Sequence, residues 1–108
     1  MVNKLFVYGT LAPNRPNEHV LTKIGGNWAK GSVRGYLHEA GWGAAMGYPG
    51  IQLHENGNKV EGYVFISDNL EENWTVLDDF EGSEYERILT TVTLENDQVM
   101  QAYIYVLR

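Results

Sequence analysis

Short apolar runs separated by turn residues predict a chain built mainly from β-strands. Residues 5–8 form the first run, which is rich in β-forming side chains and predicts a buried strand. Between residues 28 and 66 glycines recur too often for a long helix, so this stretch is expected to be β structure. Asn56-Gly57 separates two apolar runs, at residues 51–53 and 60–66, and predicts a hairpin between them.

Two helices interrupt this pattern. Asn17 can cap the first, which is short and ends at Gly25-Gly26, and its buried face would consist of Val20, Leu21 and Ile24. The second and clearer helix covers residues 70–81, with Asn69 as its cap. Gly82 ends it.

The order of the predicted elements gives the fold class. Strands at residues 85–94 and 99–107 follow the second helix and are expected to form a hairpin through residues 95–97. The strand at residues 60–66 is apolar on both faces, which is typical of a central strand. The order β-α-β-β-β-α-β-β predicts an α+β fold with mostly antiparallel pairing. Because 108 residues suffice for one core only, residues 1–108 are predicted to form a single domain.

Charge and composition exclude several classes of function. Fourteen Asp and Glu against eight Lys and Arg give a net charge of −6, which argues against nucleic acids and anionic membranes as partners. No apolar run approaches the roughly 18 residues of a membrane span. We find no signal peptide either, and therefore expect a soluble cytoplasmic protein. Without cysteine the chain has no disulfide or thiolate nucleophile, and its three scattered histidines predict no metal site.

Glu81 is a carboxylate on the helix face that should be buried. At about 100° per residue it falls within about 60° of three apolar side chains, those of Leu70, Trp74 and Leu77. Asp78 and Asp79 are expected to point to solvent. Burial, the helix C-terminus and nearby acids would raise the pKa of Glu81, as a general acid/base near neutral pH requires. A Glu81 side chain that bends to solvent, or pairs with Arg87 or Arg34, is an equally good explanation of the pattern.

A second candidate site lies where the first strand ends. Gly9 permits a sharp turn, after which the N–H groups of residues 9–11 could form a nest of donors for an anion or an oxyanion. The alternative is an ordinary junction between strand and loop. Aromatic side chains could line a pocket or belong to the core; they are Trp28, Tyr36, Trp42 and Tyr48. Tyr103 and Tyr105 face opposite to the aliphatic residues of their strand, and the pattern leaves open which face is the interior.

Three segments in this order carry a family resemblance: Val7-Tyr8-Gly9-Thr10-Leu11, Leu77-Asp78-Asp79-Phe80-Glu81 and Tyr85-Glu86-Arg87. They resemble the gamma-glutamylcyclotransferase superfamily, and within it the gamma-glutamylamine cyclotransferase branch. The likeness extends over nearly the whole chain, from Phe6 to Tyr105. It implies a small mixed, mostly antiparallel β-barrel with two short flanking helices.

The resemblance also implies an activity. A γ-glutamylamine-type substrate would be converted to 5-oxoproline and a free amine by attack of its own α-amine, with Glu81 as general acid/base. The loop of Tyr8, Gly9, Thr10 and Leu11 would bind the glutamyl head, and Tyr85 and Tyr105 would be further substrate contacts. The implied reaction needs no metal and no cofactor, and its partner is the small-molecule substrate.

Two other functions stay open at this point. One is a non-catalytic module of the same fold that binds a γ-glutamyl or other small carboxylate ligand. The other is an interaction domain that binds a partner protein through its aromatic surface. The sequence fixes neither the oligomeric state nor the leaving amine, which could be the lysine of γ-glutamyl-lysine, another amine or part of a dedicated biosynthetic intermediate.

Overall fold

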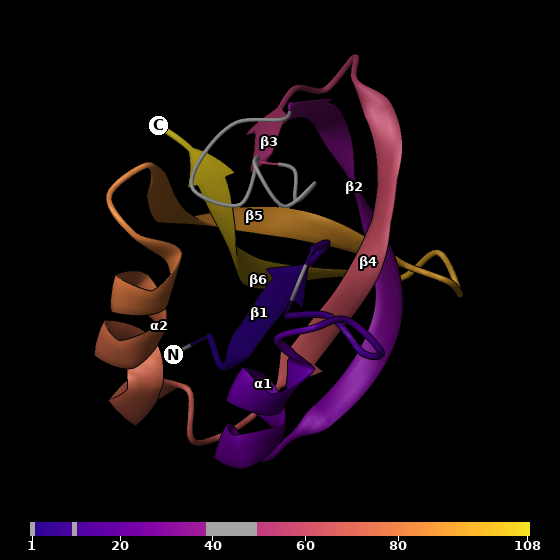
Figure 1. Cartoon of the computed structure of the whole chain (residues 1–108). Coiled ribbons are helices and arrows are strands. Elements are labelled where there is room, and N and C mark those ends of the chain that lie inside the picture. Colours follow the sequence, from indigo (N-terminus) through magenta and orange to yellow (C-terminus); the bar gives the residue numbers. More distant parts are fainter. Residues whose placement is uncertain (1, 10, 39–49) are drawn as a thin grey trace.

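Within residues 2–9, 11–38 and 50–108, which the computed structural model describes, strands and helices follow one another in the predicted order (Figure 1). The elements are β1 (Lys4–Val7), α1 (Glu18–Ile24), β2 (Asn27–His38), β3 (Gly50–Leu53), β4 (Asn58–Ile66), the 3-10 turn η2 (Glu71–Asn73), α2 (Trp74–Glu81), β5 (Tyr85–Leu94) and β6 (Val99–Leu107). The predicted order is confirmed, with η2 added before α2. No helix of the described segments is long and apolar enough to cross a membrane.

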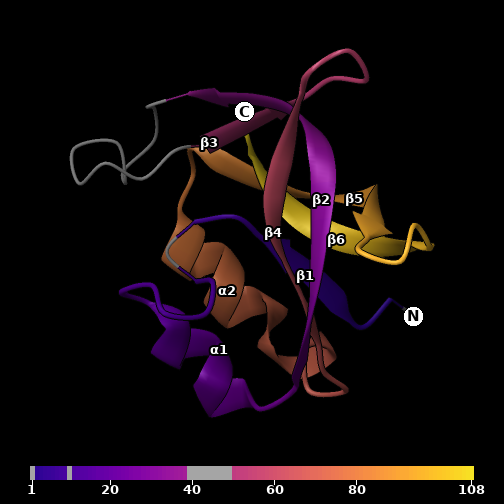
Figure 2. The same cartoon turned by 90° about the vertical axis from the view of Figure 1, so that its right-hand side faces the viewer.

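The sheet closes on itself. Its strand order is β3-β2-β4-β1-β6-β5, and β2 also pairs with β5 through Gly31–Leu94 and Ser32–Thr93. Five strands therefore form a barrel, and β3 extends it beside β2 (Figure 2). The pair β1–β6 is parallel, whereas the other described pairs are antiparallel. The implied small mixed, mostly antiparallel barrel is confirmed.

The predicted hairpin around Asn56-Gly57 is wrong in its pairing. A turn is present, since the N–H of Gly57 donates to the carbonyl oxygen of His54 at 2.9 Å. However, β3 and β4 both pair with β2, because β2 is 12 residues long and offers residues 27–35 to β4 and residues 35–38 to β3. The hairpin of β5 and β6 is confirmed, as is the central place of β4 between β1 and β2.

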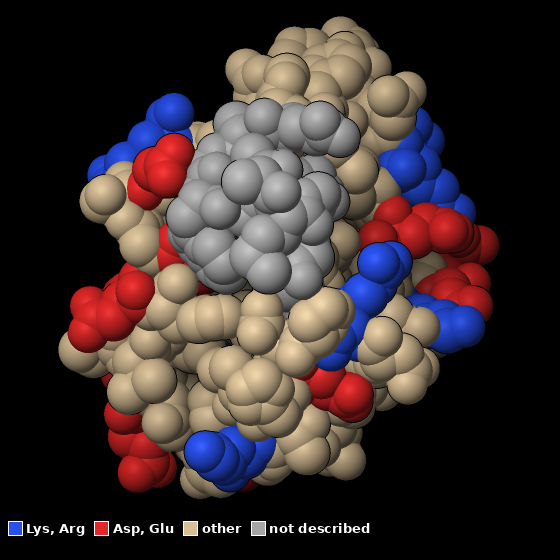
Figure 3. Space-filling model, viewed as in Figure 1, with Lys and Arg blue, Asp and Glu red and all other residues tan. Residues whose placement is uncertain are grey.

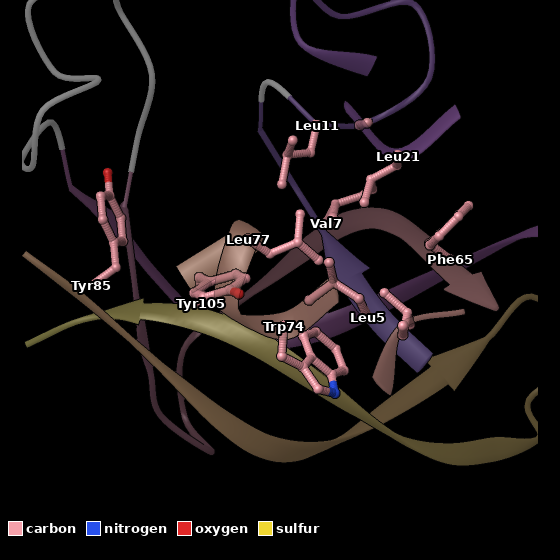
Figure 4. Close-up of a cluster of buried hydrophobic side chains, with 11 residues drawn as sticks. Leu5, Val7, Leu11, Leu21, Phe65, Trp74, Leu77, Tyr85 and Tyr105 are labelled. Atoms are coloured by element: carbon pink, nitrogen blue, oxygen red, sulfur yellow. The ribbon is translucent and has the colours of Figure 1, made fainter. Parts of the chain in front are cut away.

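Alternate residues of the same strands face two different hydrophobic cores, whereas the length of the chain predicts only one. One core fills the barrel and consists of Phe6, Val33, Ile51, Val60, Val64, Val92, Ala102, Ile104 and Val106. The other lies between the barrel and the helices and includes Leu5, Val7, Leu11, Leu21, Phe65, Leu70, Trp74, Leu77, Tyr85 and Tyr105 (Figure 4). Both faces of β6 are therefore interior: Ile104 points into the barrel and Tyr105 toward the helices.

Both helices end where predicted, but neither is capped as predicted. Gly25 (φ 85°) and Gly82 (φ 89°) each follow a helix and donate their N–H to a carbonyl four residues earlier. Asn17 makes no side-chain cap bond. Asn69 does not cap α2, because its Nδ2 instead donates to the carbonyl oxygen of Ile24 at 2.9 Å. This bond ties the end of α1 to the segment before η2.

A pair of facing glycines lies where the barrel closes. Gly31 of β2 is paired with Gly62 of β4, at the point where β2 also meets β5. A Cβ atom on Gly31 would lie 2.8 Å from Cγ1 of Val92, and one on Gly62 would lie 2.7 Å from Cζ of Phe6. The Cβ on Gly62 would also collide with the backbone oxygen of Val7. The close approach of the strands at this corner therefore requires residues without side chains.

Candidate active site

Glu81 is the last residue of α2 and lies on the stripe of side chains that packs against the barrel. Leu70 and Leu77 on this stripe are fully buried and Glu81 is half-buried, so the predicted burial is confirmed. Burial raises the pKa of the Glu81 carboxyl from its ordinary value of 4.5 to about 7. Among the described residues, no hydrogen bond or ion pair reaches this carboxyl, so it pairs with neither Arg87 nor Arg34. Glu81 can therefore take up and release a proton near neutral pH.

Three tyrosines from three parts of the barrel lie close to Glu81. Tyr8 follows β1, Tyr85 begins β5 and Tyr105 lies in β6. Burial is the main reason why the pKa of each hydroxyl is raised; the negative charge of Glu81 contributes to all three, and for Tyr105 the hydrogen bond to Asp78 contributes more than Glu81 does. Figure 4 shows Tyr105 beside Leu77 of α2 and Tyr85 further along the barrel. The structure thus brings three of the predicted substrate contacts together with the predicted acid/base.

The hydroxyl of Tyr8 makes two hydrogen bonds to the protein backbone. It donates to the backbone oxygen of Tyr105 at 2.7 Å and accepts from the backbone N–H of Ile51 at 3.1 Å. Its ring stacks on that of Phe6, with 6.4 Å between the ring centroids. Tyr8 therefore braces the end of β1 against β6 and β3, and the direct substrate contact predicted for it stays a prediction.

The loop after β1 carries two backbone donors that no described backbone group uses. The carbonyl oxygen of Gly9 accepts from the N–H of Ala12 at 3.1 Å, which closes a tight turn, and Leu11 is buried beneath it. No described backbone group accepts from the N–H of Gly9 or of Leu11, and a Cβ on Gly9 would meet nothing within 4 Å. Thr10 lies outside the described residues, so the complete nest of N–H groups stays a prediction. The candidate pocket residues Trp42 and Tyr48 lie outside them as well.

Asp78 is exposed, as the helix pattern predicts, but its carboxylate is not an isolated surface charge. Its Oδ1 accepts from Oη of Tyr105 at 2.7 Å and from Nε of Arg87 at 2.9 Å, and its Oδ2 accepts from Nη2 of Arg87 at 3.3 Å. The hydrogen bond from Arg87 is the main reason why the pKa of Asp78 lies below its ordinary value. The guanidinium of Arg87 also lies 4.3 Å from the ring centroid of Trp74 and 5.0 Å from that of Tyr103. These contacts fasten α2 to β5 and β6.

The sequence contains one signal that could have identified this cluster. Asp78 is separated from Arg87 and Tyr105 by 9 and 27 residues, so helical periodicity cannot connect them. Tyr85 and Arg87, however, are two residues apart in a strand and therefore share a face. Since Tyr85 belongs to the core under the helices, Arg87 had to meet α2.

Replacing Arg87 by Ala should lower the free energy of unfolding by about 1–2 kcal/mol, because the substitution removes a bidentate ion pair and two cation–π contacts. Urea unfolding at neutral pH measures the effect. Lys59→Ala is the control: Lys59 lies 3.9 Å from Glu61, and both side chains are more than half exposed, at 61% and 82%. Equal losses in the two variants would mean that Arg87 is only a surface charge.

The side-chain hydrogen bonds of His38 and His54 go to residues outside this site. Nε2 of His38 lies 3.1 Å from Oε1 of Gln52, and Nδ1 of His54 accepts from the N–H of Asn56. His19 is exposed on α1. Nowhere in the described segments do three or more His, Asp or Glu side chains gather as metal ligands would. Glu81 is therefore the group of the described site that fits proton transfer near neutral pH.

Comparison with known proteins yields a family. The family model for "Gamma-glutamyl cyclotransferase, AIG2-like" matches residues 5–108. The Drosophila melanogaster protein "Putative gamma-glutamylcyclotransferase CG2811" is 28% identical over 113 residues, which cover 100% of this chain and 71% of that protein. The crystal structure of an AIG2-like protein from Mus musculus has a TM-score of 0.73 at 27% identity, covering 96% of this chain and 76% of that one. YkqA from Bacillus subtilis has a TM-score of 0.77 at 25% identity, covering 100% of this chain and 36% of that one.

Proposed function

The chain belongs to the AIG2-like gamma-glutamyl cyclotransferase family, and from this we propose that it converts a γ-glutamylamine-type substrate to 5-oxoproline and a free amine. The observation that carries the proposal is the Glu81 carboxyl, which burial gives a pKa of about 7 at a helix end close to three tyrosines. A group with this pKa can act as base and acid in the same catalytic cycle at neutral pH.

In the proposed reaction Glu81 moves one proton. Its carboxylate takes a proton from the α-ammonium of the substrate, and the freed nitrogen attacks the γ-carbonyl carbon. The new carbon–nitrogen bond closes the ring of 5-oxoproline while the bond from the γ-carbon to the amine breaks. The protonated Glu81 then gives its proton to the leaving amine, and the ring nitrogen loses its second proton to solvent as the lactam of 5-oxoproline forms. Nucleophile and carbonyl belong to one molecule, so holding the substrate in a folded conformation supplies much of the rate.

The loop after β1 is proposed to bind the glutamyl head. The N–H groups of Gly9 and Leu11 have no acceptor among the described backbone groups, so they can donate to the α-carboxylate or to the oxyanion that develops on the γ-carbonyl. The open space at Gly9 allows a ligand to approach the backbone closely. Tyr85 and Tyr105 complete the proposed binding residues beside Glu81.

The negative charge of the protein indicates which leaving amines the substrate should carry. The net charge is −6, and Figure 3 shows Asp and Glu side chains along the side of the molecule on which α2 lies. A substrate whose amine half carries a positive charge is attracted by this field, and one with a further carboxylate is repelled.

The proposal is tested by measuring 5-oxoproline released from a panel of γ-glutamyl derivatives. We expect turnover, fastest with the cationic γ-glutamyl-ε-lysine, slower with a neutral γ-glutamyl alkylamide and slowest with γ-glutamylglutamate. Raising the ionic strength should narrow these differences, because salt screens the field. If no member releases 5-oxoproline while 5-oxoproline itself still binds in calorimetry, the chain is a binding module and the proposal is wrong.

The pH dependence gives a second test. The proposed base must be ionised, so kcat/KM should increase as pH rises through about 7 and level off above it, where the Glu81 carboxyl is deprotonated. Initial rates from pH 5 to 9 on the best substrate of the panel measure this increase. If kcat/KM instead rose around pH 4.5, the ordinary pKa of Glu, the assignment of a buried base would be contradicted.

A further inference from the structure

We infer that Asp78 is a positioning residue: by accepting hydrogen bonds from Arg87 of β5 and Tyr105 of β6, it clamps the last turn of α2 against the barrel and holds Glu81 half-buried. The catalytic consequence of this inference rests on the proposed function. The effect of Asp78 on the surroundings of the Glu81 carboxyl can be tested without that function.

The clamp acts on the turn that carries Glu81. Asp78 precedes Glu81 by three residues, so both belong to the last turn of α2. The N–H of Gly82 closes this turn on the carbonyl oxygen of Asp78 at 3.0 Å, after which the chain leaves the helix. With the helix ending here, side-chain contacts from the barrel must fix the angle at which the turn meets it.

The two arms of the clamp come from neighbouring strands. Arg87 donates two bonds in a fork and rests on the ring of Trp74, which lies at the start of α2, so it contacts both ends of the helix. Tyr105 donates the shortest bond, 2.7 Å, from beneath the helix. Hydrogen bonds to an ionised carboxylate are about twice as strong as neutral ones. Asp78 therefore joins α2, β5 and β6 at one point.

Loss of the clamp should change the surroundings of Glu81. The ionisable groups of the described residues that sense its charge are Tyr8, Tyr85 and Tyr105, one on each facing part of the barrel, while Asp78 lies on its own helix. Burial, and not these groups, sets the pKa of Glu81. If the last turn of α2 moves away from the barrel, water reaches the carboxylate and the pKa of Glu81 falls toward its ordinary value.

Two variants break the clamp in different ways. Asp78→Asn removes the charge that Arg87 binds, and Tyr105→Phe removes one donor without changing the charge of the pair. Asp79→Asn is the matched control, because Asp79 is adjacent, exposed like Asp78 and of the same charge, and within the described residues it makes no hydrogen bond with Arg87 or Tyr105. The Glu81 carboxyl is titrated by carbon-13 NMR in all three and in the wild type.

We expect both clamp variants to lower the pKa of Glu81 by about one unit, and Asp79→Asn to leave it in place. On the best substrate, Asp78→Asn should lower kcat about tenfold or more with KM nearly unchanged, since misplacement of the acid/base affects the transition state. In Asp78→Asn the pH at which kcat/KM is half-maximal should fall by the same amount as the pKa of Glu81 measured by NMR.

A merely structural Asp78 would give a different result. If folded Asp78→Asn and Tyr105→Phe, checked by their amide spectra, titrate Glu81 as the wild type does, the inference is overturned. If the wild type releases no 5-oxoproline from any substrate, the proposed function fails, yet the NMR titration still decides whether Asp78 positions Glu81.

Discussion

Glu81→Gln is expected to abolish 5-oxoproline release and at the same time to stabilise the protein above pH 7. Glutamine keeps the size of the side chain and can form hydrogen bonds, but it transfers no proton. General acid/base groups contribute typically about 10²–10⁴-fold to a rate, so kcat should fall by at least about 10²-fold with little change in KM. Glu72→Gln, the same change at an exposed residue of η2, should keep wild-type activity.

The stability effect follows from linkage. The Glu81 carboxyl has a pKa of about 7 in the fold against an ordinary value of 4.5. Below pH 4.5 it is neutral in the folded and the unfolded chain and costs nothing. Between these values folding takes up a proton, so the folded state loses stability as pH rises, and above pH 7 the full cost of a desolvated charge is present. Gln carries no charge at any pH and avoids this cost.

Urea unfolding of wild type and Glu81→Gln at pH 4 and pH 8 measures the difference. The two proteins should be similar at pH 4, and the variant should have the higher free energy of unfolding at pH 8. An inactive variant that is also less stable at pH 8 would mean that Glu81 supports the fold instead of the chemistry. A fully active one would exclude Glu81 as the acid/base.

Gly62→Ala should cost about 2–3 kcal/mol of stability, the largest effect on the fold that we expect from a single methyl group. The new Cβ would collide with the backbone oxygen of Val7 and lie 2.7 Å from the ring of Phe6. Because β4 is paired on both sides within the closed barrel, it cannot shift freely to relieve these contacts. Gly9→Ala is the control, because its Cβ would meet nothing within 4 Å and the cost should stay within about 0.5 kcal/mol. Urea unfolding of both variants gives the comparison, and equal losses would show that the barrel corner relaxes.

Local patterns predicted the elements well and their pairing less well. Glycines after both helices fix the helix ends through the backbone alone, so residues 25 and 82 were correctly assigned. The turn at Asn56-Gly57 is also local and is present, but β3 and β4 on either side of it pair with the longer strand β2 and not with each other. Asn69 is a residue type that often caps helices, yet its side-chain amide donates a hydrogen bond to a carbonyl oxygen of α1 instead. Such competition between elements is not visible in a local pattern.

The same limit applies to the candidate site. Glu81 stood out because a carboxylate on an apolar helix face breaks the helical pattern, and its burial is confirmed. Asp78 follows the pattern of a surface residue, so only the fold shows that Arg87 and Tyr105 bind it. Tyr8 was singled out with its loop, but its hydroxyl partners, Ile51 and Tyr105, lie 43 and 97 residues away.

The parallel pairing of β1 with β6 determines when the molecule can complete its fold during synthesis. Leu5 and Phe6 leave the ribosome long before their partners, Tyr103 and Ile104. The backbone oxygen that Tyr8 binds also belongs to β6. In a nascent chain β1 therefore lacks one of its two neighbouring strands until β6 has emerged. Pairings of such high contact order form slowly, so the apolar side chains of β1 stay exposed for longer than those of a strand whose partners are local.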